Sequence, residues 1–84
     1  MWQITRKFWT ARRVYETVAV NGGWLVQYQP ICAVNGRPWQ AKHVLNRGEN
    51  LIATAERAEL ILREHARRHG LEVTRVVEWA PLAR

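Results

Sequence analysis

Aspartate and serine are absent from the sequence, and cysteine occurs once, at Cys32. Serine and aspartate are the commonest nucleophile and orienting carboxylate of hydrolytic triads, so their absence argues against that class of enzyme. A single cysteine cannot form a disulfide within the chain. No apolar run approaches the roughly 20 residues that a membrane-spanning helix needs, and the first residues do not form a signal-peptide core. These absences predict a cytoplasmic protein.

Catalysis and metal binding have few candidate residues. Cys32 and His43 would be the one thiol–imidazole pair, but a small apolar cysteine in a β-region is ordinary core filling. His65 and His69 lie four residues apart on one predicted helix face, and Cys32 and His43 could complete a four-ligand zinc site with them. The glutamate of metalloprotease helices is missing between these histidines, and a histidine near a helix C-terminus is favoured by the dipole alone. We predict that the protein is not an enzyme and has no metal or other cofactor.

Positive charge is the most informative bulk property of the chain. Thirteen lysines and arginines stand against seven acidic residues, which gives a formal net charge of +6, and eleven of the thirteen are arginine. Arginine suits bidentate recognition of phosphate or carboxylate, and it stacks on planar rings. A GC-rich genome would also encode many arginines and alanines. The net positive field favours anionic partners in either case.

Three segments in the first half of the chain have the pattern of strands. The side chains of residues 14–20, 24–34 and 39–45 fall into two alternating sets, as on the two faces of a strand, and the second segment has a mostly apolar face. Asn21-Gly22-Gly23 and Asn35-Gly36 separate the segments and are strong turn signals. The pattern predicts three antiparallel strands joined by tight turns.

A helix is predicted for about residues 54–69. Thr54 is a suitable N-cap, and Gly70 is placed to end the helix. A fourth β segment follows in residues 71–79, where apolar and polar side chains alternate again. The residues expected to meet in the core are Ala58, Ile61, Leu62 and Ala66 from the helix and Trp24, Val26, Tyr28 and Ala41 from the sheet.

The predicted fold is α+β, with an antiparallel sheet of four to five strands packed against one helix, in a single domain of residues 1–84. Residues 2–9 alternate as a strand would, which we favour, but they also fit a helical stripe. Pro30 cannot donate to a ladder, so its strand is expected to lie at an edge or to bulge there.

Five tryptophans are too many for so small a core, so one or two are expected at the surface. Exposed tryptophan is typical of a base-stacking platform or of a protein-interface anchor. Near the N-terminus, four cations bracket the aromatic residues Phe8 and Trp9, and further basic residues lie on the third strand and the helix. Phosphates attract cations and unstacked bases need aromatic faces.

The sequence therefore predicts binding to nucleic acid or to a nucleoprotein complex. The predicted binding residues are Arg6, Lys7, Trp9, Arg12, Arg13, Gln40, Lys42, Arg63 and Arg67. The competing interpretation is a solvated basic rim around an ordinary core.

The order of elements between residues 13 and 70 resembles a known family. A strand, Asn21-Gly22-Gly23, a strand from Trp24, Asn35-Gly36, a third strand and a helix are similar to the AP2-like arm-binding domains at the N-termini of tyrosine recombinases. The resemblance implies a sheet that docks into the major groove of DNA. The residues that it implies as base readers are Gln27, Gln29, Gln40 and Lys42. The β segment after the helix departs from the family pattern.

A second interpretation belongs to a different class of function. A free-standing basic domain with several tryptophans and few catalytic residues resembles the small accessory proteins of phages and mobile elements, such as anti-CRISPR proteins. That resemblance implies inhibition of a host defence complex in the host cytoplasm, through protein contacts and without direct nucleic-acid binding. The two interpretations carry equal weight here, and the oligomeric state and any base preference stay open.

Overall fold

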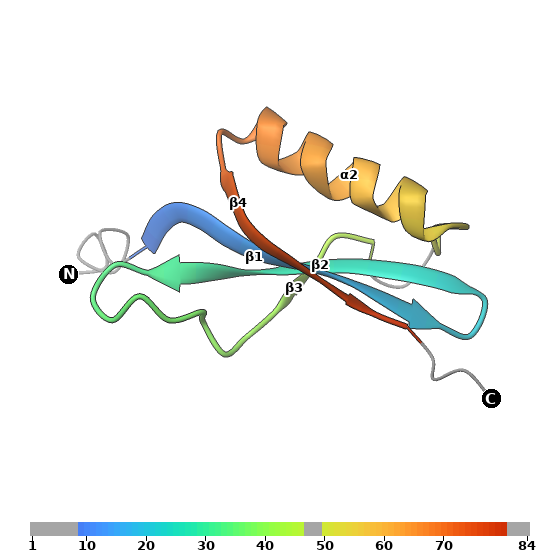
Figure 1. The fold of residues 1–84 in the computed structure, drawn as a ribbon, viewed down its shortest axis with the longest axis horizontal. Coiled ribbons are helices and arrows are strands. Elements are labelled where there is room, and N and C mark those ends of the chain that lie inside the picture. Colours follow the sequence, from blue (N-terminus) through green and yellow to red (C-terminus); the bar gives the residue numbers. More distant parts are fainter. Residues whose placement is uncertain (1–8, 47–49, 81–84) are drawn as a thin grey trace.

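The computed structural model describes residues 9–46 and 50–80, which form one sheet with a helix across one face (Figure 1). The elements are β1 (Trp9–Val20), β2 (Gly23–Cys32), β3 (His43–Val44), α2 (Ala55–Arg68) and β4 (Glu72–Trp79). The strand order is β3-β2-β1-β4. This arrangement confirms the predicted α+β class. Of the ambiguous segment 2–9, Trp9 belongs to β1 and residues 2–8 lie outside the described part of the chain.

β1 and β2 form a long antiparallel hairpin, as the alternation predicts. Val20 pairs with Gly23, so the turn has two residues, and Gly22 has the positive φ of 100° that such a turn requires. Gly23 is needed for a different reason: a Cβ there would lie 2.8 Å from the carbonyl oxygen of Ile52. The segment that precedes α2 therefore packs directly on the backbone of β2.

Pro30 lies opposite a bulge in β1. Trp9 pairs with Cys32, but Arg13, four residues further along β1, pairs only two residues earlier in β2. Proline offers no N–H to a neighbouring strand. The carbonyl oxygen of Pro30 accepts from the N–H of Trp39, so the missing donor faces the segment before β3, and the bulge in β1 lies on the other side of β2. β2 is a central strand, so the expected edge position is wrong. The pairing is irregular beside Pro30, but the extra residues are in β1 and not in the strand that contains the proline.

The third strand is much shorter than the predicted segment 39–45. A bridge joins Ile31 to Pro38, and regular pairing with β2 resumes only at His43. Between these two pairs the chain advances by five residues, from Pro38 to His43, whereas β2 spans only three, from Tyr28 to Ile31. In this second bulge the N–H of Trp39 still donates to the carbonyl oxygen of Pro30 (2.8 Å), but residues 40–42 are not in register with β2. The prediction of a regular strand over residues 39–45 is therefore wrong.

The Asn46 side chain replaces the strand where β3 ends. The N–H of Val26 donates to Oδ1 of Asn46 (3.0 Å), and Nδ2 of Asn46 donates to the carbonyl oxygen of Trp24 (3.0 Å). Backbone pairing resumes between Trp24 and Ile52, with hydrogen bonds of 2.8 and 3.1 Å. The outer edge of β2 is thus satisfied although β3 has only two residues.

α2 begins and ends at the residues that the local signals predict. The Thr54 hydroxyl accepts a hydrogen bond from the N–H of Arg57 (3.1 Å), and Gly70 adopts a positive φ of 65° after the last turn. The N–H of Leu71 donates to the carbonyl oxygen of Ala66 (2.8 Å), which closes the helix end. In residues 9–46 and 50–80, no helix is long and apolar enough to cross a membrane.

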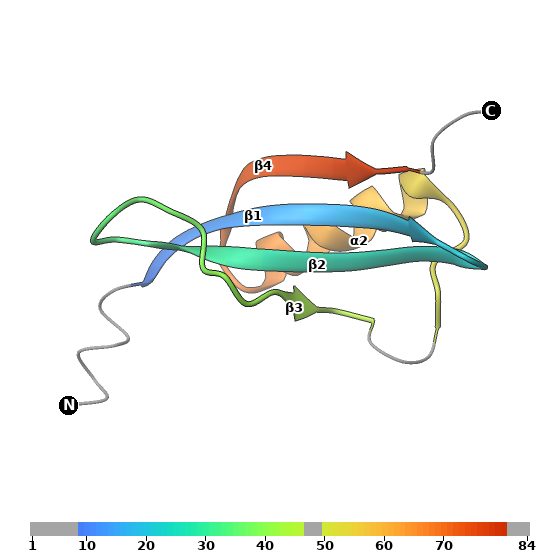
Figure 2. The ribbon, with the colours of Figure 1, turned by 90° about the horizontal axis from the view of Figure 1, so that it is seen from below.

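β4 is a strand, as predicted, but it runs parallel to β1, so the sheet is mixed rather than wholly antiparallel. The chain leaves β3 at one edge of the sheet, crosses β2 and β1 in α2, and enters β4 at the other edge (Figure 2). A helix is the usual connection that returns a chain in the same direction. Alternation along a strand shows its faces but carries no information on its direction.

The core lies between α2 and the covered face of the sheet. Its buried members are Tyr15, Val26, Ile52, Ala58, Leu62 and Ala66. Trp24, Tyr28 and Ile61 are partly buried against this cluster, as predicted. Ala41 is exposed, and its predicted place in the core is wrong because the bulge of residues 39–42 carries it away from the sheet.

Candidate binding site

A pocket of about 320 Å³ lies where the two bulges beside Pro30 meet. Its lining residues are Trp9, Arg13, Tyr28, Pro30, Trp39 and His43, and we call it the aromatic pocket. The bulge in β1 separates Trp9 from Arg13, and the bulge before β3 starts at Trp39. The pocket therefore follows from the irregular pairing on both sides of one proline.

Four of the lining residues are aromatic and form two pairs of rings. The indoles of Trp9 and Trp39 meet edge to face, with centroids 4.8 Å apart and planes at 78°. Tyr28 and His43 are stacked, with centroids 5.1 Å apart and planes at 20°. The side chain of Trp39 is 48% exposed, so the aromatic pocket offers a ring face to a planar ligand.

Arg13 supplies a fixed positive charge to the aromatic pocket. Its guanidinium carbon lies 5.8 Å from the centroid of the Tyr28 ring. Its Nη1 donates to the carbonyl oxygens of Thr10 (2.6 Å) and Arg12 (3.0 Å). Its Nε is buried and has no acceptor among the described residues. The backbone of the β1 bulge thus holds the guanidinium in place and leaves an N–H unpaired.

A buried tyrosine and a histidine support the pocket from the core. The hydroxyl of Tyr15 lies 2.9 Å from Nδ1 of His65, in the last turn of α2. Burial raises the pKa of Tyr15, which keeps the hydroxyl protonated. Burial, and after it the nearby charges of His69, Arg13 and Arg68, hold the pKa of His65 below its usual range. A neutral His65 can therefore accept a hydrogen bond from Tyr15.

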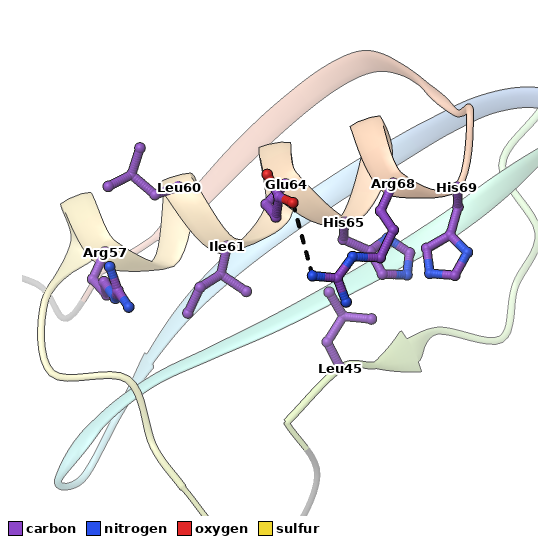
Figure 3. A pocket seen from close by; sticks show the side chains of 8 residues that line it. All are labelled: Leu45, Arg57, Leu60, Ile61, Glu64, His65, Arg68 and His69. Atoms are coloured by element: carbon purple, nitrogen blue, oxygen red, sulfur yellow. Dashed lines mark ion pairs between the residues drawn. The ribbon is translucent and has the colours of Figure 1, made fainter.

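A second concavity, of about 500 Å³, runs along α2 on the side of β3 (Figure 3). We call it the helix groove, and its lining residues are Leu45, Arg57, Leu60, Ile61, Glu64, His65, Arg68 and His69. The ring centroid of Tyr28, in the aromatic pocket, lies 5.3 Å from that of His65, which lies 4.6 Å from that of His69. The aromatic pocket and the helix groove are therefore neighbours.

The structure brings two of the predicted binding residues together. Trp9 and Arg13 line the same pocket, and Arg12 is exposed next to Arg13. Gln40 is exposed in the bulge before β3, outside the lining of either concavity. Two further predicted residues, Arg6 and Lys7, lie outside the described part of the chain.

Lys42 forms an ion pair within the protein. Its Nζ lies 2.9 Å from Oε1 of Glu16, whose carboxylate is on the face of the sheet away from α2. Glu16 is only 6% exposed, and its burial, the largest single effect, acts to raise its pKa. Hydrogen bonding from Lys42, Gln27 and Trp79 outweighs burial and lowers the pKa of Glu16 below its usual range. Lys42 therefore has a structural partner.

Arg63 and Arg67 project from α2 and are both paired. Nη2 of Arg63 lies 3.1 Å from Oε2 of Glu59, and the Arg67 guanidinium donates twice to Glu64. Exposed pairs of this kind add little stability, but each places a carboxylate beside the cation. Neither arginine lines the aromatic pocket or the helix groove.

The glutamines that the AP2-like resemblance implies as base readers are engaged within the sheet. Nε2 of Gln27 donates to Oε1 of Glu16 (2.6 Å), and Nε2 of Gln29 donates to the carbonyl oxygen of Trp39. These hydrogen bonds link β2 to β1 and to the segment before β3. Docking of this sheet face into a major groove stays a prediction.

Several lining residues were not among the predicted binding residues. The sequence analysis assigns Tyr28 to the core and leaves Trp39 and His43 on a regular strand. The prolines at 30 and 38 are the signal that could have revealed them, because proline interrupts a ladder and lets neighbouring side chains turn outward. In the helix groove, Arg57 was not singled out by the sequence, whereas Arg68 belongs to the basic residues noted on the predicted helix.

The pairing of the strands separates Cys32 from His43. Cys32 is opposite Trp9, whereas His43 is opposite Tyr28, four residues earlier in β2 and about 13 Å away along the strand. A thiolate–imidazole pair would need hydrogen-bond contact between the two side chains. Among the described residues, no three histidine, cysteine or acidic side chains are grouped as metal ligands would be.

Comparisons with protein-family models, with curated proteins and with solved structures each found no match for this chain.

Proposed function

We propose that the protein binds single-stranded nucleic acid, free or within a nucleoprotein complex, and that the aromatic pocket receives an unstacked base. The observation that carries this proposal is the meeting of Trp9, Trp39 and Arg13 around one pocket. Base–aromatic stacking contributes about 1–3 kcal/mol per base and tolerates any sequence, because every base has a π-face. The protein acts by stoichiometric binding and needs no cofactor for this role.

The dimensions of the pocket favour a single strand over a duplex. A volume of about 320 Å³ is at the lower end of the range for ligand pockets, roughly 300–1,000 Å³, and suits one planar ring system. Bases within a duplex are stacked on their neighbours and present only their edges. A base that stacks on the exposed Trp39 ring must therefore come from a single strand, a loop or a flipped position.

The charge distribution supports the same ligand. Arg13 is fixed beside the rings, with one buried N–H that lacks an acceptor among the described residues. A phosphate next to a stacked base would meet the positive charge of this guanidinium. The formal net charge of +6 adds a favourable long-range field for any polyanion.

A second candidate function, inhibition of a host complex through protein contacts, is favoured by a different residue. Trp79 is 54% exposed on the face of the sheet away from α2, next to the exposed Val20. An exposed tryptophan with apolar neighbours is typical of an interface anchor. In that case the protein would resemble anti-CRISPR proteins in its mode of action, and the aromatic pocket would play no part.

Fluorescence anisotropy with labelled oligonucleotides separates the two functions. Trp39→Ala removes one wall of the aromatic pocket and should weaken binding to a single strand at least about tenfold. Trp79→Ala is the matched control, because it removes an equally exposed indole from the opposite face and should leave this affinity unchanged. Circular dichroism of both variants checks that a loss of binding is not caused by unfolding.

The outcome of this comparison is decisive for the proposal. At physiological salt, the Kd for a single strand should be lower than the roughly 1–100 µM that is typical of non-specific association. It should also be lower than the Kd for a duplex of the same length. Binding no tighter than this background, or equal loss in the two variants, would contradict the proposal. Capture of a host protein complex that Trp79→Ala abolishes and Trp39→Ala spares would favour the inhibitor function instead.

A further inference from the structure

We infer that the helix groove is a second subsite for the same nucleic-acid strand, which receives the next nucleotides along the chain. The inference rests on the proposed function and adds a length and a path to it. The strand would enter at Trp39, pass the rings of His43 and His65, and continue along α2 toward Arg57.

Continuity between the two concavities is the first argument. Tyr28 is stacked on His43 and contacts His65, which in turn contacts His69, with ring centroids between 4.6 and 5.3 Å apart. These residues come from β2, β3 and the last turn of α2. A row of adjacent rings therefore leads from the aromatic pocket into the helix groove.

The chemistry of the groove is the second argument. Its floor is apolar and includes Leu45, which directly follows β3, and Ile61 from α2 (Figure 3). Arg57 lies at the first turn of the helix, and Arg68 and His69 lie at the other end (Figure 3). A nucleotide presents an apolar base face and an anionic phosphate side by side, and the groove offers an apolar strip with cations at both ends. The carboxylate of Glu64 also lines the groove, but it is engaged by Arg67 and Arg68.

The pairing of the arginines on α2 is the third argument. Arg63 and Arg67, which do not line the groove, each have a close carboxylate partner. Arg68 in the groove shares Glu64 with Arg67 at the longer distance of 3.8 Å, and Arg57 has no ion pair with any described residue. The cations of the groove are therefore less neutralised than those of the outer helix face.

The length of the groove sets the size of the ligand. Arg57 and His69 are twelve residues apart, so the groove is about 18 Å long. One nucleotide cannot occupy the aromatic pocket and reach Arg57 as well. The affinity should therefore increase with oligonucleotide length until both concavities are filled, and then level off.

The test uses oligothymidylates of two to ten nucleotides as probes, with the wild-type protein and two double variants. Arg57→Gln with Arg68→Gln removes the cations of the groove. Arg63→Gln with Arg75→Gln removes the same total charge from the outer helix face and from the uncovered sheet face, where Arg75 pairs with Val14. Anisotropy is measured across a salt series for each length.

For wild type and for the control variant, the affinity should rise with length over this range. The Arg57→Gln/Arg68→Gln variant should bind the shortest probes as wild type does, but should lose the gain with length. Its slope of log affinity against log salt for the long probes should be smaller by about 1.4, since each phosphate contact on a single strand contributes about 0.7.

Three outcomes would overturn the inference. They are an affinity that does not depend on length, a gain with length that the groove variant retains, and an equal loss in the control variant. If short probes in these cases still need Trp39 for binding, the proposed function stands and only the subsite in the helix groove is excluded. If no probe of any length binds above background, the proposed function itself has failed.

Discussion

The hydroxyl of Tyr15 lies 2.9 Å from Nδ1 of His65, and this contact joins the centre of the sheet to the last turn of α2. The ring of Tyr28 lies against both residues, with centroids 5.6 Å from Tyr15 and 5.3 Å from His65. Tyr28 also lines the aromatic pocket and stacks on His43. One wall of the candidate site is therefore part of the core, and the position of His65 affects both stability and the shape of the pocket.

The stability of the protein should fall as the pH decreases from 7 to 5. The pKa of His65 is lowered in the folded state, chiefly by burial, so the unfolded chain binds a proton more readily near its ordinary pKa of about 6.5. The contribution of neutral His65 is fully present above that pH and is lost as the pH falls through it toward the lower folded pKa. Thermal melting at half-unit pH steps would measure this dependence.

A matched pair of variants assigns the effect to His65. His65→Gln should flatten the pH dependence between 5 and 7, whereas His43→Gln, which changes an exposed histidine on β3, should retain it. The prediction fails if the two variants melt with the same pH dependence as the wild type.

Leu62→Ala should destabilise the protein by about 2–5 kcal/mol, because Leu62 is fully buried between α2 and the sheet and the substitution leaves a cavity. For a domain of this size, that corresponds to a decrease in Tm of at least about 8 °C. Leu60→Ala, two residues earlier and 61% exposed, should change stability by less than about 0.5 kcal/mol. Equal melting temperatures for the two variants would show that Leu62 is not buried between α2 and the sheet.

Lys42→Met should destabilise the protein by about 1–3 kcal/mol, because it removes a charged hydrogen-bond partner from the buried carboxylate of Glu16. The pKa of Glu16 lies below its ordinary value, so its contribution is present above about pH 4.5 and is lost as the pH falls below that. Without Lys42 that pKa should rise, and acid unfolding should begin at a higher pH. Arg37→Met, with the same change of charge at an exposed site, is the control for both effects.

The helix could be predicted because its signals are local. Thr54 caps it, Gly70 ends it, and the buried positions repeat at helical spacing through Leu62. The third strand could not be predicted in the same way. Its end depends on Asn46, whose side chain bonds to β2 some twenty residues earlier in the chain, and its start depends on a bulge set by the pairing of Pro38. Such long-range pairings leave no periodic trace in the sequence.

The candidate site was only partly predictable for the same reason. Trp9 and Arg13 were identified because cations and aromatics are adjacent in the sequence there. Trp39 joins them only through the strand pairing, which brings it 4.8 Å from Trp9 across thirty residues of chain. Lys42 was predicted to bind because it is a basic residue of the third strand. Its ion pair with Glu16 could not be predicted, since Glu16 precedes it by twenty-six residues and is on another strand.

Arg13→Lys should weaken single-strand binding about tenfold, equivalent to about 1.4 kcal/mol, while the net charge of the protein stays the same. The planar guanidinium lies beside the Tyr28 ring and is fixed by two backbone carbonyl oxygens. A lysine ammonium cannot reproduce this fork or its stacking. Arg12→Lys, at the exposed neighbouring position, is the control and should bind as the wild type does. Since the charge is unchanged in both variants, a simple electrostatic role for Arg13 predicts no difference between them. Anisotropy measurements that give equal affinities for the two variants would therefore reduce Arg13 to a contributor of charge and remove it from the base-binding pocket.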